Sequence, residues 1–200
     1  MKEEIINLLR STEREGMEKV IDFLEKSDFF IAPASAKKHL SHVGGLMIHS
    51  LNVYKMAKML VEQVSYMKPE LAQKLPNDSV IISSLLHDIC KTNVYKTVPR
   101  WRKDNQGRWE SYEAYENDAS RFPAGHGEKS VIMLLSLGLK LTNEEMLAIR
   151  WHMGAWGLNM QSFEDRSSIS IACEKYPLAA IIQSADNLAT YMLETEDSEK

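Results

Sequence analysis

The feature that most constrains the fold is an apolar segment that ends in ionisable residues. Residues 80–86 read Val-Ile-Ile-Ser-Ser-Leu-Leu, and His87, Asp88 and Lys91 lie within the next five positions. A helix that is apolar on nearly every side belongs in the centre of a protein, so we expect a buried helix from Val80 to Lys91. An ionised carboxylate buried there without a partner would be strongly destabilising, whereas a divalent cation beside it removes that penalty. The sequence therefore predicts a metal ion next to His87 and Asp88.

Most of the other segments show helical periodicity. Apolar residues recur at intervals of three and four, which predicts helices near residues 3–26, 46–66, 131–139, 142–153 and 177–192. A break in the first of these helices is expected near Ser11 or Gly16. Asn77-Asp78-Ser79 is expected to cap the central helix, and Thr142-Asn143-Glu144-Glu145 has the form of a capping box.

One segment has a different pattern. Between Tyr95 and Tyr115, β-branched and aromatic residues lie on both sides of Asp104-Asn105-Gln106-Gly107, which predicts a β-hairpin. The expected fold class is therefore all-α, a helical bundle with a small inserted β-hairpin at about residues 95–115. A chain of 200 residues, 44% of them hydrophobic, has the size and the apolar content of a single domain.

Composition excludes several classes of protein. The net charge of −4 argues against a general nucleic-acid binder and leaves a local basic patch open. Glu3 and Glu4 stand where a secretory signal would carry bases, and no apolar run approaches membrane-spanning length. The two cysteines, Cys90 and Cys173, fit no disulfide framework. We therefore expect a cytoplasmic protein without a membrane partner.

Further imidazole and carboxylate side chains stand in distinctive settings. His49 lies within a predicted helix, His126 is framed by two glycines, and His152 comes late in the capped helix. Asp186 interrupts the apolar last helix, as Asp88 interrupts the central one. His39 and His42, in contrast, are expected to be ordinary polar residues outside any ligand set, with a place for His42 at the mouth of the site left open.

His49, then His87-Asp88, then Asp186 resembles the H…HD…D signature of the HD-domain superfamily of metal-dependent phosphohydrolases. The flanking residues match as well, because Gly44-Gly45-Leu46 precedes the first histidine and His87-Asp88-Ile89-Cys90-Lys91 resembles the family's HDIGK, with Cys90 in place of glycine. The resemblance spans His42 to Leu193. It implies a single HD-type domain over residues 1–200, with N-terminal helices in residues 1–40 and a metal-binding core in residues 42–193.

The two remaining histidines refine this resemblance. Two-metal members of the superfamily add two histidines between the HD pair and the last aspartate, and the segments around His126 and His152 look like those additions. Such members include the HD domain of bacterial 3′–5′ exoribonucleases and the HD-type phosphodiesterases. The GYP motif of some phosphodiesterases and the nucleic-acid-binding barrel of the exoribonucleases are absent from this sequence. The ligand set that the resemblance implies is His49, His87, Asp88, His126, His152 and Asp186.

These ligands imply two divalent metal ions about 3.5–4 Å apart, bridged by Asp88 and by a water that ionises near neutral pH. The resulting hydroxide would attack phosphorus in line while the cations neutralise the phosphoryl oxygens. Imidazole and carboxylate ligands favour iron or manganese, with magnesium, zinc, nickel and cobalt left open. The implied function is a phosphohydrolase or phosphodiesterase that acts on a nucleotide or short oligonucleotide, with Asp88 and Lys91 as catalytic residues.

Cationic and aromatic residues near these motifs are candidates for binding the substrate. Lys91 lies one helical turn beyond His87, where it is either a phosphate contact or simply a cation at a helix C-terminus. Aromatic side chains and cations in the hairpin suit a base or a sugar-phosphate, although packing of the hairpin onto the helices is the more ordinary interpretation. The candidate set is Lys91, Arg121, Lys129, Arg100, Trp101 and Trp156.

Two other functions stay open at this stage. Some proteins of the superfamily use the same ligands to activate O₂, so a di-iron oxygenase is one alternative. A nucleotide-sensing module that keeps the metals without turnover is the other. The expected partner is a small phosphorylated molecule such as a nucleotide, with short RNA or DNA left open and no oligomeric state predicted.

Overall fold

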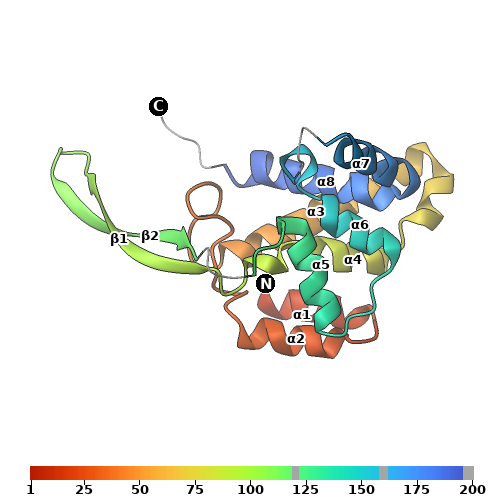
Figure 1. Ribbon diagram of the computed structural model, residues 1–200, viewed down its shortest axis with the longest axis horizontal. Helices are drawn as coiled ribbons and strands as arrows, with labels where there is room; N and C mark the ends of the chain where they lie inside the picture. The colour runs from red at the N-terminus through yellow and green to blue at the C-terminus, as the bar shows by residue number, and fades with distance from the viewer. Residues whose placement is uncertain (119–121, 158–161, 196–200) are drawn as a thin grey trace.

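The computed structural model describes residues 1–118, 122–157 and 162–195, which form a helical fold with a two-stranded antiparallel sheet (Figure 1). This confirms the expected class of a helical protein with an inserted hairpin. The α-helices are α1 (Lys2–Ser11), α2 (Met17–Lys26), α3 (Gly45–Met67), α4 (Asn77–Leu86), α5 (His126–Ser136), α6 (Asn143–Trp151), α7 (Phe163–Lys175) and α8 (Pro177–Leu188). Short helices are η1 (Pro69–Lys74), η2 (Ile89–Lys91), η3 (Gly154–Gly157) and the π-helix η4 (Ala189–Leu193), and the strands are β1 (Tyr95–Lys103) and β2 (Trp109–Asn117).

Helix α4 is the centre of the protein, as its composition predicts. Every residue from Ser79 to Leu86 is buried, and α1, α3, α6 and α8 all pack against this helix. Its boundaries differ from the expected ones. The helix begins at Asn77 after Pro76, so Asn77-Asp78-Ser79 is its first turn and not its cap. It ends at Leu86, and the 3₁₀ turn η2 follows separately. This early end releases His87 and Asp88 from regular helix.

The predicted break in the first helical segment is confirmed. α1 ends at Ser11, and α2 begins after Gly16, whose φ of 89° lies in the left-handed region that favours glycine. A Cβ atom at Gly16 would lie 2.0 Å from the carbonyl oxygen of Gly138, at the end of α5. The α1–α2 turn and the α5–α6 turn therefore touch through their backbones, and this contact needs a residue without a side chain.

Some elements were not anticipated from the pattern of the sequence. α7 carries scattered apolar residues such as Phe163 and Ile171, both exposed, so it lacks the apolar stripe that marks a helix in a sequence. α5 begins at His126, five residues before the expected start, because its first turn contains Gly127 and polar residues. Within the described residues, none of the helices combines the length and the apolar character that a membrane span requires.

The β1–β2 hairpin projects away from the helices and packs its strands only on each other along most of its length (Figure 1). The register is regular, from Tyr95 opposite Asn117 to Lys103 opposite Trp109. Trp101 and Trp109 are each 66% exposed, so the interpretation that these aromatic side chains pack the hairpin onto the helices is wrong. The hairpin extends too far from the body for a helix to cover its outer half.

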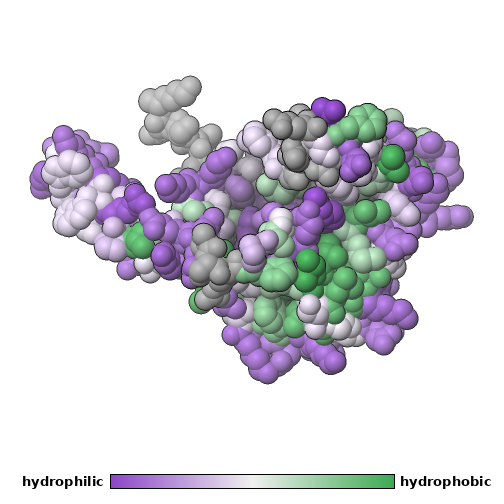
Figure 2. All heavy atoms as spheres, viewed as in Figure 1, coloured by the Kyte–Doolittle hydropathy of each residue, from purple (hydrophilic) through white to green (hydrophobic). Residues whose placement is uncertain are grey.

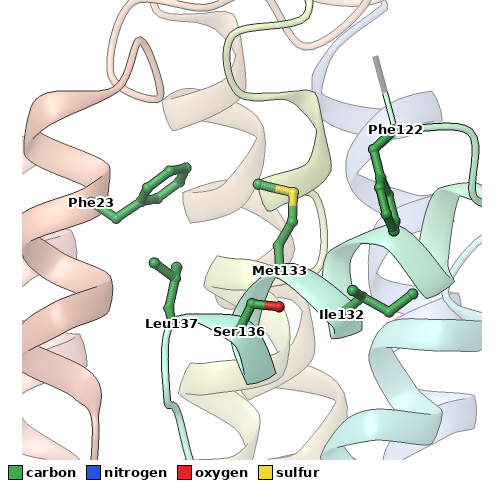
Figure 3. Close-up of a pocket in the computed structure, with 6 residues that line it drawn as sticks. All are labelled: Phe23, Phe122, Ile132, Met133, Ser136 and Leu137. Carbon is green, nitrogen blue, oxygen red and sulfur yellow. The ribbon is translucent and has the colours of Figure 1, made fainter.

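An apolar pocket of about 270 Å³ lies between α2 and α5 (Figure 3). It opens on the surface that Figure 2 colours as hydrophobic over α5. The residues that line it are Phe23, Phe122, Ile132, Met133, Ser136 and Leu137. No titratable side chain is among the residues that line this pocket, whereas several titratable side chains meet at the end of α4.

Candidate metal centre

His87 and His152 are held by the same local device. Each is the first residue after an α-helix, α4 and α6 respectively. The Nδ1 atom of His87 lies 2.7 Å from the carbonyl oxygen of Ser84, and that of His152 lies 2.6 Å from the carbonyl oxygen of Ile149. A ring that donates its Nδ1–H to a carbonyl leaves its Nε2 lone pair for another partner. Both Nε2 atoms point into one buried cluster.

The Nε2 atom of His152 is the clearest test of whether a cation fits this cluster. It is buried and makes no hydrogen bond to any of the described residues. The Oδ1 atom of Asp88 lies 3.5 Å from it. Burial lowers the pKa of His152, so the ring is neutral and its lone pair is free. A buried lone pair without a donor is what a metal ion would satisfy.

His49, on α3, brings a third imidazole to the cluster. Its Nε2 atom lies 3.2 Å from the Nε2 atom of His87 and 3.1 Å from Oδ1 of Asp186, on α8. Its Nδ1 atom is engaged by Glu194 at 2.9 Å. Two lone pairs at this distance repel, so either a proton or a cation must lie between the rings. Burial lowers the pKa of His49, but hydrogen bonds to Asp186 and Glu194 outweigh that effect and raise it to about 9.

Asp88 lies between the two halves of the cluster and is 2% exposed. Its Oδ1 atom lies 2.6 Å from Nε2 of His126, at the start of α5. Its Oδ2 atom lies 2.6 Å from Nζ of Lys91 and 3.4 Å from Nε2 of His87. Burial would raise the pKa of Asp88, but the charges of Lys91 and the neighbouring histidines hold it well below its usual range. The carboxylate is therefore ionised and faces ligands on both sides.

All six predicted ligands meet in this cluster. Their donor atoms form overlapping groups within 4.8 Å, and these are His49/His87/Asp88, Asp88/His126/His152 and His87/His152/Asp186. Four of the residues are buried, while the side chain of His126 is 32% exposed and that of Asp186 is 15% exposed. Imidazoles and carboxylates on rigid helix ends are a donor set for a transition metal ion. Buried His and Asp groups of this protein could therefore hold a metal ion.

Two residues of the cluster were missed or misjudged in the sequence. His39 was expected to be an ordinary polar residue, but its ring centroid lies 5.1 Å from that of His49. Burial, helped by the charges of His49 and Lys91, lowers the pKa of His39 to about 4. Glu194 stands in an acidic C-terminal stretch that carries no site signal, yet it is 4% exposed and also accepts a hydrogen bond from Asn52 at 2.9 Å.

The substrate-binding candidates divide into two groups. Lys91 and Lys129 line an open cleft of about 620 Å³ beside the cluster, together with Lys37, Lys38, Tyr95 and His126. Three other candidates, all among the described residues, do not line this cleft. Arg100 is paired with Glu116, Trp101 lies on the projecting hairpin, and Trp156 is 85% exposed. Arg121 lies outside the described residues.

Comparison of the chain with protein-family models, with curated proteins and with solved structures gives no match.

Cys90 takes the position of the glycine in the motif, and it is buried beside the cluster. Its Sγ atom lies 3.4 Å from Nδ1 of His126, and its backbone N–H donates to Oγ of Ser130. The interpretation of Cys90 as a small buried residue agrees with its 4% exposure. Its Sγ atom also lies 3.8 Å from Nε2 of His126, so the thiol packs against this ring.

Proposed function

We propose that this protein is a metal-dependent phosphohydrolase of the HD-domain type that cleaves a phosphoester of a nucleotide or short oligonucleotide. One observation carries the proposal. The groups His49/His87/Asp88 and Asp88/His126/His152 share Asp88 and no other residue. A carboxylate with one donor group on each side is the arrangement that a pair of metal ions requires of a bridging ligand.

The residues that would hold the ions are His49, His87, Asp88, His126, His152 and Asp186. Iron and manganese suit this donor set best. When bound, two such ions would supply positive charge to the phosphoryl oxygens and would ionise a water at neutral pH. The donors are positioned before any ligand arrives, because the rings of His87 and His152 are fixed by backbone carbonyls and that of His49 by Glu194.

Lys91 supplies the link between the cluster and a substrate. Its Nζ atom lies 2.6 Å from Oδ2 of Asp88, and its side chain is 16% exposed and lines the cleft. The charge of Asp88 raises the pKa of Lys91 against the opposing effect of burial, so the ammonium group is charged. A lysine in that position binds a phosphoryl oxygen as a point charge.

The cleft favours a phosphorylated substrate over O₂. Besides Lys91 it is lined by Lys37, Lys38 and Lys129, against one acidic residue, Asp118, in the described lining, and this excess of ammonium groups suits a ligand with several negative charges. Activation of O₂ itself needs no such excess, so an oxygenase would use it only to bind an anionic organic substrate. The lysines of the cleft therefore support a phosphohydrolase over the oxygenase alternative. A sensing module would bind the same kind of ligand and would differ from a phosphohydrolase only in lacking turnover.

The proposal is tested with the purified protein, loaded in turn with Mn²⁺, Fe²⁺ and Ni²⁺, on phosphomonoesters, cyclic nucleotides and short RNAs. We expect hydrolysis of at least one class, and a loss of at least about 100-fold together with lower metal content in Asp88→Asn. The matched control is Asp78→Asn, because Asp78 is an exposed aspartate in the first turn of α4, the helix that ends two residues before Asp88.

Three results would overturn the proposal. The first is Asp88→Asn with full activity and full metal content. The second is O₂ consumption by the iron-loaded protein with every phosphoester left intact. The third is tight nucleotide binding without product after long incubation with each metal, which would identify a sensing module.

A further inference from the structure

The two faces of the β1–β2 hairpin differ in chemistry. Side chains alternate between the faces of a strand, and the register pairs Tyr95 with Asn117 and Lys103 with Trp109 without a slip. Four aromatic residues therefore share one face, and they are Tyr95, Trp101, Trp109 and Tyr115. The rings of Tyr95 and Tyr115 lie 6.3 Å apart, centroid to centroid, as expected for neighbours on that face.

The opposite face is occupied by ion pairs within the hairpin. Arg102 donates to Glu110 at 2.6 Å, and Arg100 is paired with Glu116. The guanidinium of Arg102 also lies 5.1 Å from the ring centroid of Tyr112. Both arginines of this face are therefore paired with glutamates, and Lys96 lies on the same face. The aromatic face holds one cation, Lys103, whose Nζ atom lies 5.6 Å from the ring centroid of Trp109, and one exposed acid, Glu113.

The aromatic face runs down to the cleft beside the candidate metal centre. Tyr95 and Asn117, at the base of the hairpin, are on the aromatic face and also line the cleft. The cleft then leads to the lysines at positions 37, 38, 91 and 129 and to His126. At about 3.3 Å per residue, the distance along the strand from Tyr95 to Trp101 is about 20 Å. A ligand that reaches both the indole rings and the metal centre must therefore be an extended chain.

We infer that the hairpin is a stacking arm for single-stranded nucleic acid, with bases on Trp101 and Trp109 and backbone phosphates among the lysines of the cleft. The inference rests on the proposed function and names its substrate class. Unpaired bases stack on exposed aromatic rings without regard to sequence, and lysines track the backbone. A base-paired duplex cannot offer its base faces to the indoles. A protein partner would bury the aromatic face, but it would not account for the four lysines that line the cleft at the base of the hairpin.

The test measures affinity, because affinity does not depend on turnover. Fluorescein-labelled single strands of about ten nucleotides, in RNA and DNA with cleavage-resistant phosphorothioate linkages, are titrated with the metal-loaded protein. A labelled dinucleotide and a duplex of the same length are the comparison ligands. The variants are Trp101→Ala combined with Trp109→Ala, and the control Tyr112→Ala on the opposite face. All three side chains are exposed, so the variants are expected to fold.

We expect the longer single strand to bind at least tenfold more tightly than the dinucleotide or the duplex. The double tryptophan variant should lose at least about tenfold in affinity for the long strand, the effect of losing one stacked base, and Tyr112→Ala should keep the affinity of the natural chain. Equal affinity for long and short single strands would overturn the inference. So would an unchanged affinity in the double variant.

Two further results separate this inference from its rivals. A dimer of the natural chain that the double variant dissociates, without any effect on nucleic-acid binding, would make the aromatic face a protein interface and overturn the inference. Tryptophan-dependent binding of the long strand without hydrolysis of any phosphoester would overturn only the proposed function. Hydrolysis of mononucleotides without length-dependent binding would overturn only the stacking arm.

Discussion

His49 and His87 face each other through their Nε2 atoms at 3.2 Å, although each ring uses its Nδ1 atom elsewhere. In the absence of a metal ion, a proton on His49 resolves this conflict, in line with its pKa of about 9. His126 is likewise protonated in the absence of a metal ion. Burial lowers its pKa, but the charge and hydrogen bond of Asp88 raise it to about 10. The metal-free cluster therefore holds protons at the positions where cations would bind.

Metal binding at neutral pH should release protons. His49 and His126 are protonated below pH values of about 9 and about 10, and each must become neutral to bind a metal ion. We expect a release of about two protons per chain near pH 7.5, and an affinity that rises with pH until both rings are neutral. Calorimetric titration in buffers of different ionisation enthalpy measures the release. His126→Gln should release about one proton fewer, and no release in the natural chain would contradict the assignment.

Glu194 positions the ring of His49 through its Nδ1 atom, the ring nitrogen that does not face His87. Its carboxylate accepts the Nδ1–H of His49, and Glu194→Gln keeps the shape of the side chain while removing its charge. We expect a loss of about 10-fold to 100-fold in metal affinity, as for other carboxylates behind a ligating histidine, and a lower pKa of His49. Metal competition and NMR titration of the histidine rings check the two effects. Glu62→Gln, on the exposed end of α3, is the control, and equal affinities in the two variants would refute the role.

The resemblance to the HD-domain superfamily implied all six clustered donors, whereas the apolar context alone marked only His87, Asp88 and Asp186. Neither could identify Glu194, because a glutamate in the acidic stretch from Glu194 to Lys200 looks like any solvated residue. The burial of Glu194 depends on the packing of the π-helix η4, which ends at Leu193, against α3, and no local pattern encodes that packing. His39 was misjudged for the same reason, since the segment between α2 and α3 has no periodicity to orient it.

At the scale of elements, the predicted cap of α6 also links this helix to other parts of the fold. The capping box of Thr142 and Glu145 is present as the sequence predicts. Glu145 is fully buried and also accepts two hydrogen bonds from Arg14, at 2.7 and 2.8 Å. Ser79 of α4 donates to it at 2.7 Å. One carboxylate thus joins α6, which ends at His152, to α4, which ends at His87.

Glu145→Ala should therefore destabilise the whole fold. The change leaves the half-buried guanidinium of Arg14 without its carboxylate partner and removes the cap, so we expect a loss of about 3–5 kcal/mol in the free energy of unfolding. Urea denaturation measures it. Glu144→Ala, in the same turn of α6 and not fully buried, should cost less than about 1 kcal/mol. Similar losses in the two variants would show that the network contributes little.

The hairpin and α7 mark the limits of prediction for elements. Aromatic and β-branched residues on both sides of Asp104–Gly107 predict a hairpin whether it packs on the helices or extends into solvent. The existence of the hairpin was therefore correctly expected. The same pattern cannot tell whether a face meets helices or solvent, and the exposure of Trp101 was not foreseen. Helix α7 was not predicted from the sequence. It lies on the surface with scattered apolar residues, so it lacks the periodicity by which an amphipathic helix is recognised.

At the scale of the whole molecule, the candidate ligands come from distant parts of the chain. His49 lies on α3, Asp186 on α8, and His126 at the start of α5, with the other three at the ends of α4 and α6. A bound cation would therefore tie five helices to one point. Since the unfolded chain does not hold these residues together, metal binding adds directly to folding stability.

Metal addition should raise the melting temperature. At a free metal concentration about 100 times Kd, one site adds about 2.7 kcal/mol, which for a chain of this size is about 5–10 °C. Differential scanning calorimetry with and without Mn²⁺ measures the shift, and a chelator should reverse it. Asp88→Asn should show little of the shift. An equal rise in this variant and in the natural chain would place the stabilising ions outside the cluster.

The hairpin leaves the helical body at Tyr95 and returns at Asn117, directly opposite in the register. An insertion whose two ends meet in this way makes no demand on the core, so residues 96–116 can be lengthened, shortened or exchanged at little cost in folding. Selection could thus change the hairpin without disturbing the helices that carry the candidate metal centre. Sequence differences among homologous chains should accordingly concentrate in residues 96–116, and exchange of this segment between such chains offers a route to altered ligand preference.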